Sequence, residues 1–184
     1  MAQAPANKTF VISAKRVDTC RMQAIITLGL PGCGKSTWAG HEAARLSATI
    51  IERDLIRAEM TREAGEEFSW ASWDFSREAE VTRRWQAAKA AALAARVSVI
   101  FADTNLHVGY RRELVADLQR AGYSVRYVFF DVAPEVCRAR NATRGPKAVA
   151  EVAYDKLAPG FEAARASLAQ EAKEPGVALE VIRG

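Results

Sequence analysis

The chain has 184 residues, of which 49% are hydrophobic and 26% are charged. This length predicts one domain with one core, and the composition excludes the disordered, collagen-like and membrane-embedded classes of protein. No apolar run approaches the roughly 20 residues of a transmembrane helix, and the N-terminal segment lacks a signal-peptide pattern. Three widely spaced cysteines predict neither a disulfide framework nor a zinc site. We therefore expect a soluble, cytoplasmic protein without a membrane partner.

The net charge of +4 is distributed unevenly along the chain. Residues 1–22 hold four basic side chains against one acidic side chain, so the excess is mostly a property of this N-terminal extension. It is therefore weak evidence for a general nucleic-acid surface. A second basic run, residues 138–147, has no acidic residue and contains Arg138, Arg140, Arg144 and Lys147. Taken alone, such a run is typical of a solvated helix face.

Apolar, β-branched runs alternate with amphipathic stretches along the chain. Strands are expected at residues 24–28, 48–52, 97–102 and 125–131, with 177–182 as a candidate last strand. Helices are expected at 75–96, around 114–121, from Pro134 to a break at Gly145–Pro146, and in part across 152–169, where Pro159–Gly160 interrupts the pattern. The alternation predicts an α/β fold with a parallel sheet of four to five strands flanked by helices. The domain is expected at 23–184, and 1–22 is either a tail or adds an edge strand at 9–13.

A phosphate-binding motif follows the first of these strands. Residues 29–36, GLPGCGKS, match G-x-x-x-x-G-K-[ST] and precede a predicted helix, a context that makes a chance glycine-rich turn a poor alternative. Backbone N–H groups of such a loop surround phosphates, its lysine charge acts on the transferring phosphate, and its serine binds magnesium. We therefore predict ATP and Mg²⁺ binding, with Lys35 also catalytic and Ser36 also a metal ligand. The predicted nucleotide-binding residues of this segment are Gly29, Gly32, Cys33, Gly34, Lys35, Ser36 and Thr37.

Two acidic residues follow the second and third predicted strands, at the sheet edge where ligands bind in open α/β folds. Asp54 is predicted to be the general base that aligns and deprotonates an acceptor hydroxyl, with Glu52 as the rival base. Asp103 is predicted to hold the magnesium. For both aspartates the alternative is a helix N-cap without a catalytic role.

Several segments in series carry a resemblance to a known family. They are residues 27–39, the run RDLIR at 53–57, DTNL at 103–106, FDV at 130–132 and RNATRGPKAV at 140–149. With these motifs the chain resembles the polynucleotide 5'-hydroxyl kinase family, known from bacteriophage end-healing enzymes, from near Gln23 to near Gln170. The Asp-x-Asp-x-Thr signature of the 3'-phosphatase half of those enzymes is not present in this sequence.

The resemblance implies a P-loop kinase fold with a helical lid, and transfer of the γ-phosphate of ATP to the 5'-hydroxyl end of DNA or RNA. The expected partner is a nucleic-acid 5'-hydroxyl end, preferentially single-stranded. The resemblance also implies that Asp54 is the general base and that Arg57 holds the phosphate 3' to the acceptor nucleoside. Arg144 and Arg140 are implied to reach the nucleotide from the lid. The implied acceptor site consists of Asp54, Arg57, Asp103 and Thr104.

Two other functions remain open from the sequence. A kinase for a nucleoside, sugar or antibiotic shares the loop and the base but has no use for a phosphate-binding Arg57. A nucleotide-dependent regulatory module needs Asp54 only as a helix cap. A further pair of interpretations concerns Trp70, Trp73 and Phe75, which either stack on acceptor bases or pack the helix at 75–96 against the sheet.

Overall fold

The computed structural model describes residues 9–12 and 22–184, and its centre is a six-stranded sheet. The strands are β1 Thr9–Ile12, β2 Gln23–Leu28, β3 Thr49–Ile51, β4 Val99–Phe101, β5 Ser124–Asp131 and β6 Val177–Arg183. Their order is β1-β6-β5-β2-β4-β3, and all neighbours are parallel except β1, which runs antiparallel to β6. The predicted parallel sheet of an α/β fold is thereby confirmed, and β1 is an added edge strand within the range expected for one.

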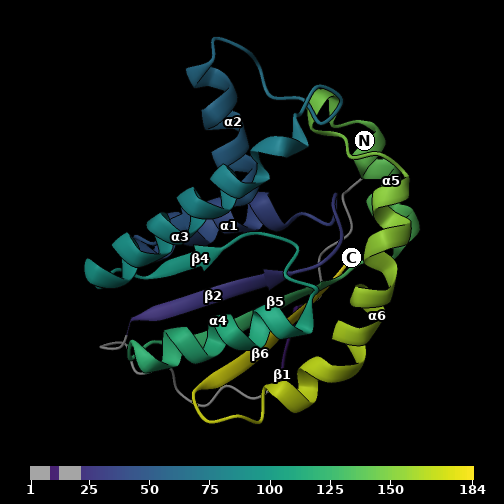
Figure 1. The fold of residues 1–184 in the computed structure, drawn as a ribbon. Coiled ribbons are helices and arrows are strands. Elements are labelled where there is room, and N and C mark those ends of the chain that lie inside the picture. The colour runs from purple at the N-terminus through teal and green to yellow at the C-terminus, as the bar shows by residue number, and fades with distance from the viewer. Residues whose placement is uncertain (1–8, 13–21) are drawn as a thin grey trace.

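Helices connect the strands and cover the sheet (Figure 1). They are α1 Lys35–Leu46, α2 Arg53–Glu63, α3 Glu78–Ala94, α4 Val108–Arg120, α5 Pro134–Ala142 and α6 Val152–Glu171, with short 3₁₀ turns η1 Phe75–Arg77 and η2 Gly145–Lys147. In Figure 1, α2 rises beyond the sheet at the top, and α5 lies with α6 on the right-hand side. Within the described residues, no helix is long and apolar enough to cross a membrane.

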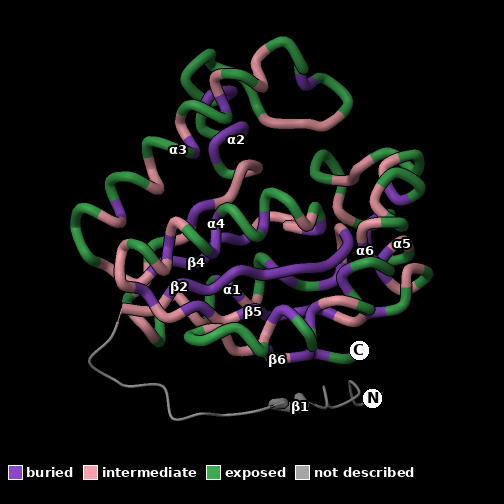
Figure 2. Tube along the Cα trace, turned by 60° about the horizontal axis from the view of Figure 1, so that its bottom comes forward, coloured by how far each residue is buried: buried purple, intermediate pink, exposed green. Residues whose placement is uncertain are grey.

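The core follows the central strands. Every residue of β4, and all of β2 except Gln23, is buried, because these strands have neighbours on both edges and helices over their faces. Figure 2 shows this as a continuous buried path along β2, with exposed residues on the outer faces of the helices. The near-continuous apolar character of these strands is what a parallel sheet covered on both faces requires.

Helix α6 departs from the sequence prediction, because it continues through Pro159 without a break. A proline inside a helix removes one backbone donor, at a cost of about 3 kcal/mol. Burial of one apolar face of α6 offsets that cost, since Phe161, Ala164 and Leu168 are almost completely buried. At Gly160 a side chain would meet Leu106, with a Cβ only 3.2 Å from the Leu106 Cβ, so the glycine permits close packing there.

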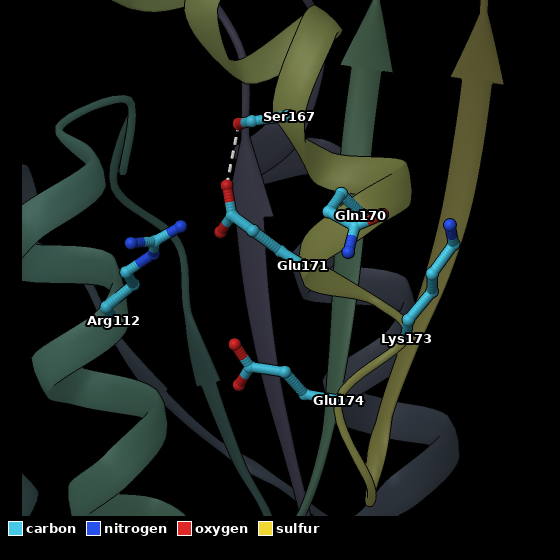
Figure 3. A pocket seen from close by; sticks show the side chains of 6 residues that line it. All are labelled: Arg112, Ser167, Gln170, Glu171, Lys173 and Glu174. Atoms are coloured by element: carbon cyan, nitrogen blue, oxygen red, sulfur yellow. Dashed lines mark hydrogen bonds between the residues drawn. The ribbon is translucent and has the colours of Figure 1, made fainter.

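A buried ion pair joins α6 to α4. The guanidinium of Arg111 donates to both carboxylate oxygens of Glu171, at 2.6 and 2.9 Å, and both side chains are shielded from solvent. The hydroxyl of Ser167 donates to the same carboxylate at 2.7 Å, as Figure 3 shows beside a shallow cavity of about 360 Å³. These hydrogen bonds keep the pKa of Glu171 below its ordinary value although burial acts in the opposite direction.

Candidate active site

The predicted phosphate-binding loop lies between β2 and α1, with Gly34 as the N-cap of α1. Gly32 has a φ of 81°, and a Cβ at this position would lie 2.4 Å from the carbonyl oxygen of Cys137. Only glycine fits there, because a side chain would collide with the backbone of α5. Among the described residues no side chain caps the N-terminus of α1, and the first N–H groups of a helix have no partner within it, which is the arrangement that binds phosphate at a helix N-terminus.

Lys35 lies inside this loop. Its ammonium donates to the carbonyls of Gly29 and Leu30 at 2.9 and 2.8 Å, and it contacts the sulfur of Cys33 at 3.5 Å. The backbone N–H of Cys33 donates to the Leu30 carbonyl, which closes the turn. Burial raises the pKa of the neighbouring Cys137 thiol to about 11, so this cysteine stays protonated at neutral pH. The contacts with Gly29 and Leu30 hold the Lys35 ammonium group inside the loop.

Glu52 is the carboxylate that lies against the loop serine. The Ser36 hydroxyl donates to Glu52 Oε1 at 2.9 Å, and Glu52 occupies the N-cap position of α2. Burial raises the pKa of Glu52, and the hydrogen bond from Ser36 opposes that shift. Glu52 entered the sequence analysis only as a rival base for Asp54. The structure places it beside the predicted magnesium ligand instead.

Asp103 connects the end of β4 to the start of α2. Its Oδ1 accepts a hydrogen bond from the Arg53 backbone N–H at 2.8 Å, and its Oδ2 accepts one from the Trp85 indole at 3.0 Å. Burial raises the pKa of this carboxyl group. Asp103 therefore satisfies a free N–H in the first turn of α2, 50 positions away in the chain, and through that contact helps to place Asp54.

Asp54 and Arg57 lie three positions apart near the start of α2 and contact each other. Arg57 Nη1 lies 2.6 Å from Asp54 Oδ1, and the same guanidinium donates from Nε and Nη2 to the two oxygens of Glu78, at 2.9 and 2.8 Å. Burial disfavours the charge on Arg57, but the hydrogen bonds to Glu78 and Asp54 outweigh it and raise the Arg57 pKa. Glu78 was not among the predicted site residues, because no motif marks it.

The three aromatic residues near this ion-pair cluster differ in burial and contacts. Trp73 is buried and donates from its indole nitrogen to Glu78 at 2.7 Å, so it packs the structure. Trp70 is half-buried, with its ring 4.8 Å from the Arg57 guanidinium carbon. Phe75 stacks on Trp70, with 6.2 Å between the ring centroids, and remains exposed.

The basic run at 138–147 forms α5 and η2, the segment predicted as the lid. Its arginines have different surroundings. Arg138 is paired with Glu151 and Asp155 of the following segment and lies over the Tyr154 ring, a structural set of contacts. Arg140 and Arg144 instead line the large cleft beside the phosphate-binding loop. The run is therefore neither wholly a solvated face nor wholly a ligand surface.

One set of contacts closes the lid segment on itself, and another joins it to the loop. Asn141 donates to the Val149 carbonyl at 2.9 Å and accepts from the Val149 N–H at 3.0 Å. The Tyr154 hydroxyl lies 3.0 Å from the Pro31 carbonyl and 3.2 Å from that of Cys137. Since a hydroxyl has one proton, it donates to one of these carbonyls at a time. Tyr154 thus joins α6, α5 and the phosphate-binding loop.

A cleft of about 1550 Å³ collects these groups at the carboxyl ends of the strands. All but one of the predicted site residues line it: Gly32, Cys33, Gly34, Lys35, Ser36, Thr37, Asp54, Arg57, Asp103, Thr104, Arg140 and Arg144. Gly29 is the exception, and its carbonyl faces Lys35. Glu52, which the sequence offered as a rival base, and Trp70 and Phe75, for which it left two roles open, also line the cleft. Glu78 lines it too, and no sequence motif marked this residue.

The cleft contains oxygen ligands suited to magnesium, but few of them. In the part of the chain that the structure describes, no group of three or more His, Cys, Asp or Glu side chains is arranged to hold a metal ion. Magnesium binds phosphate oxygens, water and one or two protein oxygens in enzymes of phosphoryl transfer. The Ser36 hydroxyl and the Glu52 carboxylate fit that requirement.

A phosphate-binding loop at the edge of a parallel sheet, with two arginines of a helical segment facing the same cleft, defines a nucleotide-binding protein with a P-loop kinase-like fold. The chain belongs to the AAA domain family, whose model matches residues 25–174. This match covers the loop, the lid segment and all of α6.

Solved structures share the fold at low sequence identity. A chain of the Pnkp1/Rnl/Hen1 RNA repair complex matches with a TM-score of 0.63 and 21% identity, over 84% of this chain and 49% of that one. The Mycobacterium tuberculosis APS kinase CysC, in complex with AMPPNP and APS, matches with a TM-score of 0.52 and 20% identity, over 72% and 75% of the two chains. A gluconokinase from Sinorhizobium meliloti 1021 matches with a TM-score of 0.51 and 19% identity, over 85% and 81%. The likeness establishes the fold, and the substrate is a separate question.

Proposed function

We propose that the protein transfers the γ-phosphate of ATP to the 5'-hydroxyl end of a polynucleotide. The observation that carries this proposal is the contact between Asp54 and Arg57 at the cleft. It places a carboxylate able to accept a hydroxyl proton beside a guanidinium able to hold a phosphate, on the same helical turn. A polynucleotide end presents both groups, because its 5'-hydroxyl and its first internucleotide phosphate belong to one nucleotide.

The nucleotide half of the reaction is assigned to the loop and the lid. The N–H groups at the start of α1 would bind the β-phosphate, and Lys35 would move from its loop carbonyls to the β- and γ-oxygens. Arg144, assisted by Arg140, would stabilise the charge that develops on the transferring phosphoryl group.

Magnesium, when bound, would neutralise charge on the phosphate oxygens. We assign Ser36 and Glu52 to holding it, because their oxygens already lie 2.9 Å apart beside the loop. Asp103 would keep this region in place through its hydrogen bonds to Arg53 and Trp85, and it remains a candidate metal-associated acid.

Binding of the acceptor depends on which N–H groups of Arg57 are free and on the net charge around them. Three of its five N–H groups already donate to Asp54 and Glu78, which leaves two for a phosphate. The cluster of one guanidinium and two carboxylates has a formal charge of −1, which disfavours any anionic phosphate, the singly charged internucleotide phosphate included. This charge is the observation that favours a second candidate function, phosphorylation of a small neutral or cationic alcohol.

Transfer of ³²P from [γ-³²P]ATP to a 5'-hydroxyl oligonucleotide tests the proposal. The same oligonucleotide with a 5'-phosphate is the matched control, and the Lys35→Ala variant is the control for contaminating kinases. Label on the 5'-hydroxyl oligonucleotide alone, lost with Lys35→Ala, would support the function. Label that goes instead to a nucleoside or a sugar would establish the small-molecule kinase, and ADP release without transfer would favour the regulatory module.

A further inference from the structure

Phe75 is a large apolar side chain exposed at the rim of the active-site cleft. It keeps 64% of its surface exposed, although it lines the same cleft as Asp54 and Arg57. One face of its ring rests on Trp70, at an interplanar angle of 30°. An exposed aromatic ring supported from behind is suited to stacking on another flat, apolar group.

Trp70, which supports the Phe75 ring, is held in place by backbone and ring contacts. The Trp70 backbone N–H donates to the carbonyl of Pro146 at 3.1 Å, which ties the segment before η1 to the lid. The Trp70 ring also packs edge-on against Phe68, at 5.5 Å between centroids, and Phe68 packs against buried Trp73. Phe75 therefore lies on a preorganised aromatic cluster, and stacking on it requires little reordering of the protein.

Asp54, Arg57, Trp70 and Phe75 form a series in which each side chain contacts the next. The successive separations are 2.6 Å between Asp54 and Arg57, 4.8 Å from the Arg57 guanidinium to the Trp70 ring, and 6.2 Å from that ring to Phe75. A polynucleotide end has a matching series. Its 5'-hydroxyl is followed by the first internucleotide phosphate and then by the second nucleoside.

We propose that Phe75, supported by Trp70, stacks on the base of the second nucleotide of the acceptor strand. The inference rests on the proposed function, because it places the 5'-hydroxyl at Asp54 and the first phosphate at Arg57. Every base has an aromatic face, so the contact favours acceptors of two or more nucleotides without sequence preference. It also favours single-stranded or frayed ends, since a base within a duplex is already stacked on both faces.

Comparison of three acceptors separates stacking on Phe75 from the contacts at Asp54 and Arg57. The acceptors are a nucleoside 3'-monophosphate, a dinucleotide 3'-monophosphate, and the same dinucleotide with an abasic second sugar. We expect KM for the complete dinucleotide to be about tenfold lower than KM for the other two acceptors. Stacking of a base on an aromatic side chain contributes about this much to affinity. Phe75→Ala should abolish this advantage, and Phe75→Trp should keep it. Leu55→Ala is the matched control, because Leu55 is 51% exposed on α2 and does not line the cleft.

An unchanged KM ratio in Phe75→Ala, or equal KM values for the complete and abasic dinucleotides, would overturn the stacking role. Absence of transfer to all three acceptors would instead overturn the proposed function. In that case binding decides the inference, through the fluorescence anisotropy of a single-stranded oligonucleotide labelled with fluorescein at its 3' end. Weakening of about tenfold in Phe75→Ala but not in Phe75→Trp would support stacking, and equal affinity in all variants would refute it.

Discussion

Arg57 and Glu78 lie 21 positions apart in the chain and form a two-pronged ion pair, with Nε and Nη2 of the guanidinium 2.9 and 2.8 Å from the two carboxylate oxygens. This pair holds the N-terminal half of α2 against the first turn of α3. It also fixes the plane of the guanidinium, so that Nη1 faces Asp54. The orientation of the predicted base and the charge available to an acceptor phosphate are both set by Glu78.

Replacement of Asp54 by asparagine should lower turnover by about a hundredfold or more, because the amide does not accept the hydroxyl proton. ATP affinity should stay close to normal, since Asp54 is hydrogen-bonded to Arg57 and not to the phosphate-binding loop. Single-turnover transfer assays and ATP titrations measure the two effects. Near-normal turnover would remove the general-base role.

The Glu52→Gln variant shows, in the same assays, whether Glu52 acts as the general base or holds magnesium. Because glutamine keeps an acceptor for the Ser36 hydroxyl but removes the carboxylate charge that would hold magnesium beside it, we expect the magnesium concentration needed for tight ATP binding to rise about tenfold. Titration of ATP affinity against Mg²⁺ reports this without catalysis. A loss of turnover with an unchanged magnesium requirement would assign the base to Glu52.

Arg144→Ala should reduce turnover much more than it reduces ATP affinity, because a lid arginine acts mainly on charge developed in the transition state. Arg138→Ala is the matched control on the same segment. Its partners are Glu151, Asp155 and the Tyr154 ring, so this change should affect stability more than turnover. Full activity of Arg144→Ala would contradict the lid assignment.

Arg57→Ala should reduce the difference in KM between a nucleoside 3'-monophosphate and the bare nucleoside as acceptors. A charge-assisted contact of guanidinium to phosphate is worth about 1.5 to 3 kcal/mol, or roughly ten- to a hundredfold in acceptor affinity. KM values for the two acceptors measure the difference. Equal catalytic efficiency on both acceptors in the unmodified protein would exclude the phosphate anchor and favour the small-molecule kinase.

Glu78→Gln should change stability in a way that depends on pH. Its hydrogen bonds with Arg57 hold the Glu78 pKa below the ordinary value of 4.5, so its ionised form stabilises the folded state. That contribution is complete above the ordinary pKa and is lost as pH falls through the lower pKa of the folded protein. The difference in free energy of unfolding between wild type and variant should therefore be constant above about pH 5.5 and shrink below pH 4.5. Denaturant titrations at each pH test this, and a difference independent of pH would contradict it.

Arg111→Met should destabilise the fold by about 3 to 5 kcal/mol, because it leaves the buried Glu171 carboxylate without its cation. The double variant Arg111→Met with Glu171→Leu should recover much of this loss, since no buried charge then remains. Urea unfolding of the two variants and the wild type gives the comparison. A single variant as stable as the wild type would show that the pair contributes little to stability.

The sequence alone determined the phosphate-binding loop and the five parallel strands. Both follow from local information: the loop needs particular residues at fixed spacing, and buried parallel strands need short apolar runs between helical segments. The adjacency of Asp54 and Arg57 was also accessible, because residues three apart on a helix share one face. The same local rules were wrong for α6, where burial of one face outweighed the helix-breaking tendency of Pro159.

Only the tertiary structure decided which distant groups join this site. Glu78 is 21 positions from Arg57, and Trp85 is 18 positions from the Asp103 carboxylate that accepts its hydrogen bond. Nothing in the local sequence distinguishes Glu78 from the other acidic residues of its helix. Its partner Arg57 comes within hydrogen-bond distance only when α2 and α3 pack together. The same packing buried Trp73 and left Phe75 exposed at the cleft, a difference that depends on how the segment between α2 and α3 folds onto the core.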